Sequence, residues 1–313
     1  MQEINFSFII PHMNTPLLLE RCIKSIPARN DVEIIVIDDA SDDSFVNKGN
    51  FPGIRNPLVK VHFGKVNRGA GASRNLGLEL ASGKWVIFAD ADDYFNYCLD
   101  ECLDYYMNSN SDMVFFKANS VDTVTYTNSY RSLQLNRFVD LYKRNPEKGS
   151  NLLRFRFGEP WARMIKKSVV KRNNIKFDET IIHNDTMFSL LVGYYSKGIE
   201  VDDRAVYCFT TRQNSISFST NNDKRLARIW VFARVEIFFD EKHIRMSKIY
   251  KHVISLTFFL FTNQLYFKKG LSVMNNLNFS TRQVFLKMFY TFPYFLVDLN
   301  KTWLRKLIYN TLY

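Results

Sequence analysis

The chain has 313 residues, 46% of them hydrophobic and 23% charged, a globular composition that excludes an intrinsically disordered protein. Its formal net charge of +11 allows three kinds of partner: a nucleic acid, an anionic membrane face or a phosphorylated substrate. The sequence contains no zinc-finger spacing, no aromatic RNA-binding motif and no basic zipper region, so we expect no nucleic-acid partner.

Strand and helix patterns alternate through the first 116 residues. The predicted elements are strands at 6–10, 32–37, 58–63, 85–89 and 113–116 and helices at 17–26, 70–81 and 98–108. Repeated strand–helix units of this length predict an α/β fold, in which helices cover both faces of a mostly parallel sheet. Sheets of this kind bind ligands beyond the carboxyl ends of their strands.

The rest of the chain has a different pattern. Residues 117–220 are more irregular, with helices predicted at 161–172 and 186–196. Residues 221–313 are predicted as helices with Lys and Arg on one side and Phe, Tyr, Leu and Ile on the other. This region suits helices lying on an anionic membrane surface, and it equally suits a helical subdomain packed on the rest of the protein or on another subunit. No apolar run reaches the roughly 18 residues of a spanning helix, so none is predicted.

Two of the predicted strands run directly into acidic clusters. Asp90, Asp92 and Asp93 follow the strand at 85–89. One aspartate could cap the next helix, but three carboxylates within four positions need a cation, hydrogen-bond donors or solvent. Hard oxygen ligands favour Mg²⁺ or Mn²⁺, which commonly bridge to substrate phosphates. We therefore predict a metal site at Asp92 and Asp90.

The second acidic cluster begins after the strand at 32–37. Asp39 stands at this strand end, where its carboxylate could accept a hydrogen bond from a base or a ribose hydroxyl. The alternative is an Asx-turn followed by a helix cap at Ser41. If the two clusters meet at one edge of the sheet, the binding function is favoured.

A glycine-containing segment opens the helix at 70–81. Gly69 and Gly71 let the backbone approach a ligand, and a helix N-terminus favours phosphate. The third glycine of a dinucleotide-binding motif is replaced by Arg74, so a Rossmann-type cofactor site is disfavoured. Arg74 is expected either to reach a pyrophosphate or to hold the aspartate cluster in place.

Four segments in order resemble the motifs of the family 2 glycosyltransferases, which have the GT-A fold. Residues 9–14, 36–42, 67–75 and 88–93 match the family's apolar run with Pro-x-Tyr-Asn, its Val-Asp-Asp-Gly-Ser-x-Asp, its Asn-x-Gly with Ala-Arg-Asn, and its Asp-x-Asp-Asp. The resemblance implies a GT-A domain with a nucleotide-sugar-binding half at 1–116 and an acceptor-binding half at 117–220. A C-terminal helical region at 221–313 would follow.

The resemblance also implies roles for particular residues. Asp39 would bind the base, Arg74 would lie by the ribose or phosphates, and Asp92 would bind the metal. The full set implied for the nucleotide sugar is Pro11, His12, Asn14, Asp39, Asn67, Arg74, Asp90, Ala91 and Asp93. Three departures from the family pattern stand in these motifs: Met13 for Tyr, and two milder changes, Ala40 for Gly and Ala91 for Ser.

Residues 177–188 resemble the segment that carries the family's catalytic base. Asp185 matches the Asp of its Glu-Asp pair, and Asn184 replaces the Glu. As a base, Asp185 would take the proton of the acceptor hydroxyl, and direct attack would invert the anomeric centre. The alternative is a helix N-cap. Trp161 is expected to stack on a sugar or to pack in the core, and Arg212 to face the pyrophosphate or to form a surface ion pair.

The resemblance thus predicts a metal-dependent, inverting glycosyltransferase that uses a nucleotide sugar, most simply a UDP-sugar, and Mn²⁺ or Mg²⁺. Its acceptor would be a glycan or a lipid-linked molecule of cell-surface polysaccharide synthesis. The alternatives are a sugar-phosphate nucleotidyltransferase and a non-catalytic nucleotide-sugar-binding protein. Since no secretory signal opens the sequence, we expect a cytoplasmic protein, either free or peripheral on the inner face of the membrane.

Overall fold

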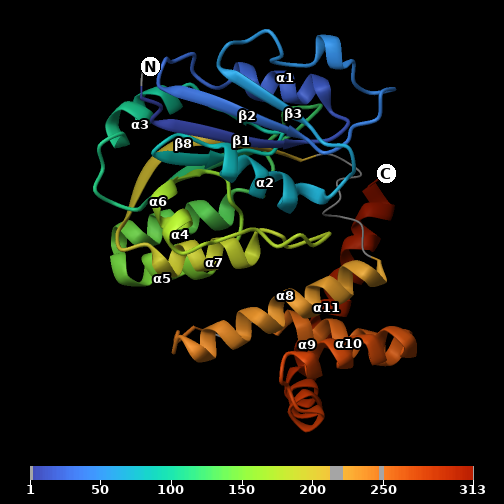
Figure 1. Cartoon of the computed structure of the whole chain (residues 1–313). Coiled ribbons are helices and arrows are strands. Elements are labelled where there is room, and N and C mark those ends of the chain that lie inside the picture. Colours follow the sequence, from blue (N-terminus) through green and yellow to red (C-terminus); the bar gives the residue numbers. More distant parts are fainter. Residues whose placement is uncertain (1–2, 212–220, 247–249, 313) are drawn as a thin grey trace. The chain divides into compact units, whose positions relative to one another are not determined.

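The structure is a computed structural model of the whole chain and describes residues 3–211, 221–246 and 250–312, with side chains as far as Val297 (Figure 1). The chain divides into two compact units. The first unit contains residues 1–180 and 184–215, and the second contains residues 181–183 and 216–313. Both halves expected at 1–116 and 117–220 thus fall almost entirely within the first unit.

An eight-stranded sheet forms the centre of the first unit, in the order β3-β2-β1-β4-β7-β6-β8-β5. The strands are β1 (Phe6–His12), β2 (Val32–Asp38), β3 (Val59–Phe63), β4 (Trp85–Phe88), β5 (Tyr94–Phe95), β6 (Met113–Asp122), β7 (Arg163–Lys166) and β8 (Ile199–Thr211). The first four strands in chain order are parallel to their neighbours among themselves, and β6 is parallel to β8. Strand β7 is antiparallel to β4 and β6, and β5 is antiparallel to β8.

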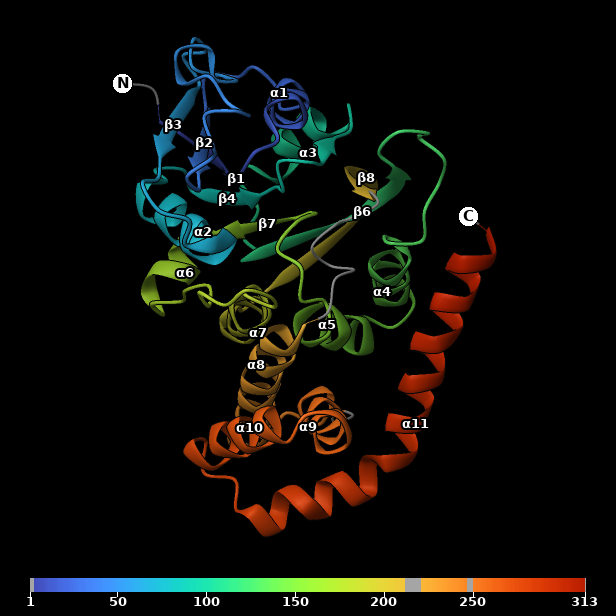
Figure 2. The same ribbon diagram turned by 90° about the vertical axis from the view of Figure 1, so that its right-hand side faces the viewer.

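Helices cover both faces of this sheet. They are α1 (Pro16–Lys24), the short η1 (Lys48–Asn50), α2 (Gly69–Leu80), α3 (Leu99–Tyr106), α4 (Leu133–Arg144), α5 (Pro146–Phe155), α6 (Lys167–Arg172) and α7 (Thr186–Tyr195). Helices α1 and α3 lie on one face, and α2, α6 and α7 lie on the other (Figures 1 and 2). The predicted fold, a mostly parallel sheet between helical layers, is confirmed.

The register of the central strands determines where their ends meet. Strand β2 is buried along its whole length and β1 almost entirely, as expected for the middle of a parallel sheet. His12 at the end of β1 pairs with Asp38 at the end of β2, and Ile9 pairs with Phe88 at the end of β4. The segments that follow these three strands therefore emerge at the same edge of the sheet.

The prediction of a helix at 161–172 is wrong for the first half of this range. Arg163–Lys166 forms β7, and only Lys167–Arg172 is helical, as α6. Partners on both sides, β4 and β6, supply backbone hydrogen bonds that the short apolar pattern alone did not reveal. Strand β6 also runs past the predicted end at 116, because its polar continuation pairs with β8 as far as Asp122.

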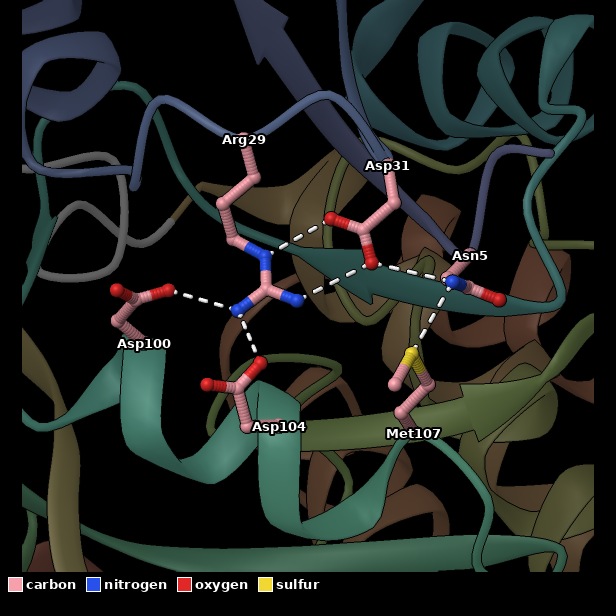
Figure 3. A network of polar contacts seen from close by, with 6 residues as sticks. All are labelled: Asn5, Arg29, Asp31, Asp100, Asp104 and Met107. Carbon is pink, nitrogen blue, oxygen red and sulfur yellow. Dashed lines mark hydrogen bonds and ion pairs between the residues drawn. The ribbon is translucent and has the colours of Figure 1, made fainter. Parts of the chain in front are cut away.

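An ionic network closes the opposite, amino-terminal edge of the sheet (Figure 3). Arg29 donates from Nε to Asp31 at 2.8 Å and from Nη1 to Asp100 at 2.8 Å and Asp104 at 2.6 Å. Asp31 immediately precedes β2, and both other aspartates belong to α3 or its start. The network joins α3 to the amino-terminal end of β2, and the acidic cluster lies at the carboxyl end of the same strand.

The second unit is helical, as predicted for residues 221–313. It contains α8 (Asn222–Glu241), α9 (Lys251–Thr262), α10 (Gln264–Asn276) and α11 (Thr281–Leu312). Its core contains Ile229, Ala233, Val253, Leu256, Phe259, Met274, Val284 and Met288. Over the described residues, no helix is both long enough and apolar enough to cross a bilayer.

Candidate active site

The loop after β1 is fixed by a buried histidine. His12 is 2% exposed, its Nδ1 lies 2.8 Å from Asp38 Oδ1, and its Nε2 accepts from the Thr15 amide at 3.1 Å. Because Nε2 is an acceptor, Nδ1 carries the proton and donates to Asp38. Both ring nitrogens are engaged within the chain. His12 therefore fixes the loop after β1, and both of its ring nitrogens form hydrogen bonds within the protein.

A second set of contacts joins the β1 loop to the β2 loop. The Asn14 amide donates to Ser41 Oγ at 2.8 Å, and Asn14 Oδ1 accepts from the Asp42 amide at 2.9 Å. Ser41 donates to Asp38 and caps no helix, so the capping alternative for Ser41 is not what the structure shows. Asn14 and Ala40 both have left-handed backbones, with φ of 57° and 58°. Ala40 thus occupies a conformation that favours glycine, and the change from the family's Gly carries backbone strain.

Asp39 holds the start of α2. Its carboxylate accepts from the backbone amides of Arg68 at 2.8 Å and Gly69 at 2.7 Å. The residue is 8% exposed, and Gly69 has a φ of 85°. Asn67 Oδ1 also accepts from the Gly69 amide, at 3.1 Å. A carboxylate has about four acceptor positions, so these two bonds leave room for a donor from a ligand.

Gly71 in the first turn of α2 is required by the chain's own packing. A Cβ at Gly71 would lie 2.0 Å from the backbone oxygen of Asp178 and 3.1 Å from the Asn184 side chain. The sequence predicted that this glycine would admit a ligand, whereas here it admits the backbone of the loop that precedes α7. Its effect is to let Asp178 and Asn184, which precedes Asp185, pack against α2.

Arg74 connects the helix to two parts of the site. Its Nη2 donates to Asp90 Oδ1 at 2.6 Å and its Nη1 donates to Asn184 Oδ1 at 2.9 Å. Arg74 is 5% exposed, whereas the Asp90 side chain is 32% exposed. The guanidinium therefore holds the carboxylate after β4 next to the loop before α7, and it offsets one negative charge of the acidic cluster.

Asp185 lies within the electrostatic reach of this group. Burial, with the charges of Glu159 and Asp90, raises the pKa of Asp185 to about 6 against the opposing effect of Arg74. Asp185 occupies the N-cap position of α7, yet its side chain makes no capping hydrogen bond. The N-cap alternative thus describes its position but not the use of its carboxylate. A carboxylate with a pKa near neutrality is suited to accept a proton.

Asp93 points into the protein. Tyr207 donates to Asp93 Oδ2 at 2.6 Å, and the Thr210 amide donates to Oδ1 at 2.7 Å. Burial, together with the charges of Asp92 and Asp90, raises the pKa of Asp93 well above its usual value. Neither Asp92 nor Asp93 caps α3, which begins at Leu99. Two of the three clustered carboxylates are thus stabilised by donors of the chain itself.

The remaining predicted residues are placed as follows. Trp161 is 3% exposed and stacks on Tyr207 with ring centroids 5.3 Å apart, so the structure places it in the core. Ala91 is also buried, and Pro11 pairs with Ile37 in the sheet. Arg212 lies outside the described residues.

Sequence reasoning missed Arg163. This side chain is 1% exposed, donates to Ser189 Oγ through Nη2, and is attracted by Asp185 and Glu159. Burial lowers its pKa to about 10. An arginine at the start of an apolar strand, between Trp161 and Met164, was the available signal. Its contacts with Ser189 and with the backbone oxygen of Pro160 join the start of β7 to α7, the helix that Asp185 begins.

Comparisons with known proteins identify the family. The family model described as glycosyl transferase family 2 matches residues 7–173. The glycosyltransferase EpsJ of Bacillus subtilis is 26% identical over 219 residues, which are 67% of this chain and 62% of EpsJ. The poly(ribitol-phosphate) beta-glucosyltransferase of Bacillus spizizenii is 26% identical over 218 residues, which are 67% of this chain and 33% of that enzyme. The chain thus spans less than two thirds of these relatives.

A solved structure shares the fold. S. aureus TarS 1-349 in complex with UDP-GlcNAc has a TM-score of 0.59 and 22% identity, over 82% of this chain and 72% of that one.

Proposed function

The chain belongs to glycosyl transferase family 2, and from this premise we propose that it transfers a sugar from a nucleotide-sugar donor to an acceptor hydroxyl with inversion. One observation supports this proposal above the others. Hydrogen bonds connect Asp39 through α2 and Arg74 to Asp90 and Asn184, with Asp185 next in the chain. The residues expected to bind base, phosphate and acceptor are therefore linked around one helix.

In the proposed reaction Asp185 is the base. The acceptor oxygen forms a bond to the anomeric carbon while its proton passes to the Asp185 carboxylate. The bond between the anomeric carbon and the donor's diphosphate breaks, and the nucleoside diphosphate leaves with the bonding electrons. Because the nucleophile enters opposite the leaving group in one step, the anomeric configuration inverts. The pKa of about 6 leaves Asp185 mostly ionised at neutral pH, as a base requires.

We propose UDP as the nucleotide and a cell-surface glycan or a lipid-linked precursor as the acceptor. The support is the UDP-GlcNAc complex of TarS and the poly(ribitol-phosphate) acceptor in the name of the Bacillus spizizenii relative. In this assignment the free acceptor positions of Asp39 face the base, and Arg74 lies near the phosphates.

We further propose that Asp92 and Asp90 hold Mn²⁺ or Mg²⁺. Among the described residues, no group of three or more His, Cys, Asp or Glu side chains is arranged to hold a metal. The residues present fit the other common mode, in which one or two carboxylates bind the ion and substrate phosphates complete its shell. The ion would supply positive charge to the departing diphosphate. The chain's own contribution to that charge is Arg74, which is held against Asp90.

Nucleotide release from a panel of UDP-, GDP-, CDP- and dTDP-sugars, with Mn²⁺, with Mg²⁺ and with EDTA, tests the proposal. We expect release of the nucleoside diphosphate from one donor class, increased by metal and by an acceptor glycan. Incorporation of pyrophosphate into a nucleoside triphosphate would instead identify a nucleotidyltransferase. Donor binding without release under every condition would identify a non-catalytic binding protein. Full activity in EDTA would exclude the metal.

A further inference from the structure

The second unit has an unusual distribution of charge. Residues 221–313 carry fifteen Lys and Arg against five Asp and Glu, so ten of the eleven net positive charges of the chain fall in this unit. The first 220 residues are nearly neutral by comparison. The net positive charge, which by itself allowed three kinds of partner, therefore belongs to the helical unit and not to the candidate active site.

An apolar patch is exposed on the same unit. We define this apolar patch as Phe261, Phe285, Phe289, Phe292 and Leu296. The rings of Phe261 and Phe292 have centroids 6.2 Å apart, so the patch continues from the end of α9 onto α11. Phe289 is 77% exposed. Large aromatic side chains gathered in this way on a protein surface indicate an interaction site.

Helix α11 is apolar on nearly every side in this stretch. Val284 and Met288 belong to the unit's own core, and the buried Phe295 stacks on Phe261. The side chains exposed beyond the apolar patch are Leu286, Tyr290, Tyr294 and Val297. Lys287 is the only charged residue from 284 to 297, and it donates to Glu236. A helix that is apolar all round belongs in a protein interior or in a membrane. The stretch is about 21 Å long, too short to span a bilayer but long enough to lie in its interface.

We propose that the apolar patch docks the protein on an anionic lipid bilayer, with α11 lying in the plane of the interface. Lys268, Lys269 and Arg282 are exposed on α10 and α11, and Phe267 of α10 has its ring 6.3 Å from Phe285 of the patch. Basic side chains thus border aromatic ones, the arrangement that lets cations bind lipid phosphates while aromatic rings enter the acyl boundary. Docking does not depend on the proposed sugar transfer.

A second copy of the chain is the competing occupant. Two such units would bring about ten net positive charges against ten others, which opposes self-association at low salt. An anionic bilayer instead complements this charge. The charge of the second unit therefore decides in favour of lipid.

Flotation of the full-length chain with vesicles tests the proposal. Vesicles of phosphatidylcholine alone are compared with vesicles that also contain phosphatidylglycerol, at low and high salt. We expect binding to the anionic vesicles, little binding to the neutral ones, and loss of binding as salt rises. Equal binding to both kinds of vesicle, or none to either, would overturn the proposal.

Matched variants separate the aromatic and the basic contributions. Phe289→Glu should weaken binding at least tenfold, because it removes a ring that enters the bilayer and adds a charge that the anionic lipid repels. Tyr97→Glu makes the same change at a 95% exposed aromatic in the first unit and should leave binding unchanged. Lys268→Glu should weaken binding about fivefold or more, and since this lysine is exposed the variant should fold. Equal losses of vesicle binding in the Phe289 and Tyr97 variants would contradict docking through the apolar patch. A dimer in sedimentation that Phe289→Glu dissociates, with no effect on vesicle binding, would contradict it as well.

Discussion

Replacement of Asp185 by Asn should make the protein less active and more stable at the same time. The pKa of Asp185 is raised from 3.8 to about 6, chiefly by burial. Two pKa units correspond to about 3 kcal/mol. Asp185 keeps some surface exposure, so solvent screening should reduce this to about 1–2 kcal/mol. The variant has no charge to desolvate, so its first unit should be more stable than the wild type by that amount at pH 7.

The sign of the pH dependence follows from proton binding. Between pH 3.8 and about 6 the folded protein holds a proton on Asp185 that the unfolded chain has released. The contribution of Asp185 to stability therefore falls as pH rises through this window, and it stays low above it. In Asp185→Asn this contribution is absent, so the stability difference between variant and wild type should be near zero at pH 4 and should grow towards pH 7.

Activity should move in the opposite direction. A base must be ionised, so wild-type turnover should rise with pH, reach half of its plateau near pH 6 and level off about one pH unit higher. Asp185→Asn should lose roughly 10²- to 10⁴-fold in turnover of the donor that the nucleotide panel identifies. Hydrogen exchange of the β1 and β4 amides measures the stability of the first unit alone.

Asp31→Asn is the matched control, because it makes the same chemical change at the other edge of the sheet. The hydrogen bond from Arg29 lowers the pKa of Asp31 despite its burial, so its stabilising effect is present above pH 3.8 and is lost as pH falls. This variant should be less stable by up to about 1 kcal/mol at pH 7 and should retain activity. If Asp185→Asn behaves like Asp31→Asn in both assays, the assignment of Asp185 as a base whose pKa is raised by burial is incorrect.

Three further changes test other parts of the site. Gly71→Ala places a Cβ 2.0 Å from a facing backbone oxygen, so the free energy of unfolding in urea should fall by about 1–3 kcal/mol and turnover should fall as well. In the control Gly158→Ala the nearest neighbour of the added Cβ is at 4.0 Å, so the free energy of unfolding should change by less than about 0.5 kcal/mol. Arg74→Gln removes a charge that lowers the pKa of Asp185, so the acidic limb of the pH–rate profile should shift to higher pH; an unshifted limb would mean that another group sets it. Ala40→Gly relieves a φ of 58° and should raise the free energy of unfolding by about 0.5–1 kcal/mol, after the greater chain entropy of glycine is subtracted. The midpoint of thermal unfolding should rise accordingly, and a lower midpoint would show that the strain is small.

The part of the site that the sequence could predict depends on strand ends. Parallel strands emerge at one edge, so Asp39 and Asp90 were expected to meet there from patterning alone. The structure places both at that edge and joins them through α2. Arg74 was expected either to reach a phosphate or to hold the aspartates, and the second alternative is visible directly as its ion pair with Asp90.

The parts that could not be predicted involve partners distant in the chain. Asp93 is held by Tyr207 and Thr210, which lie 114 and 117 residues later on β8. No local sequence pattern predicts such partners, because the hydrogen bonds to Asp93 form only when β8 returns to the edge of the sheet where β4 ends. The same holds for Trp161, whose stacking on Tyr207 places it in the core and not at an open surface.

These long-range contacts also explain how three aspartates can share one strand end. Asp93 is turned inward and satisfied by two donors, and Asp90 is paired with Arg74, so their mutual repulsion is reduced by the chain itself. A cation is therefore not needed merely to hold the cluster together. Its proposed place is at Asp92 and Asp90 when a diphosphate arrives, and on this reasoning metal affinity should be weak in the free protein and should increase with bound nucleotide. Calorimetric titration of Mn²⁺ with and without UDP measures that coupling, and equal affinities would mean that the carboxylates alone determine metal binding.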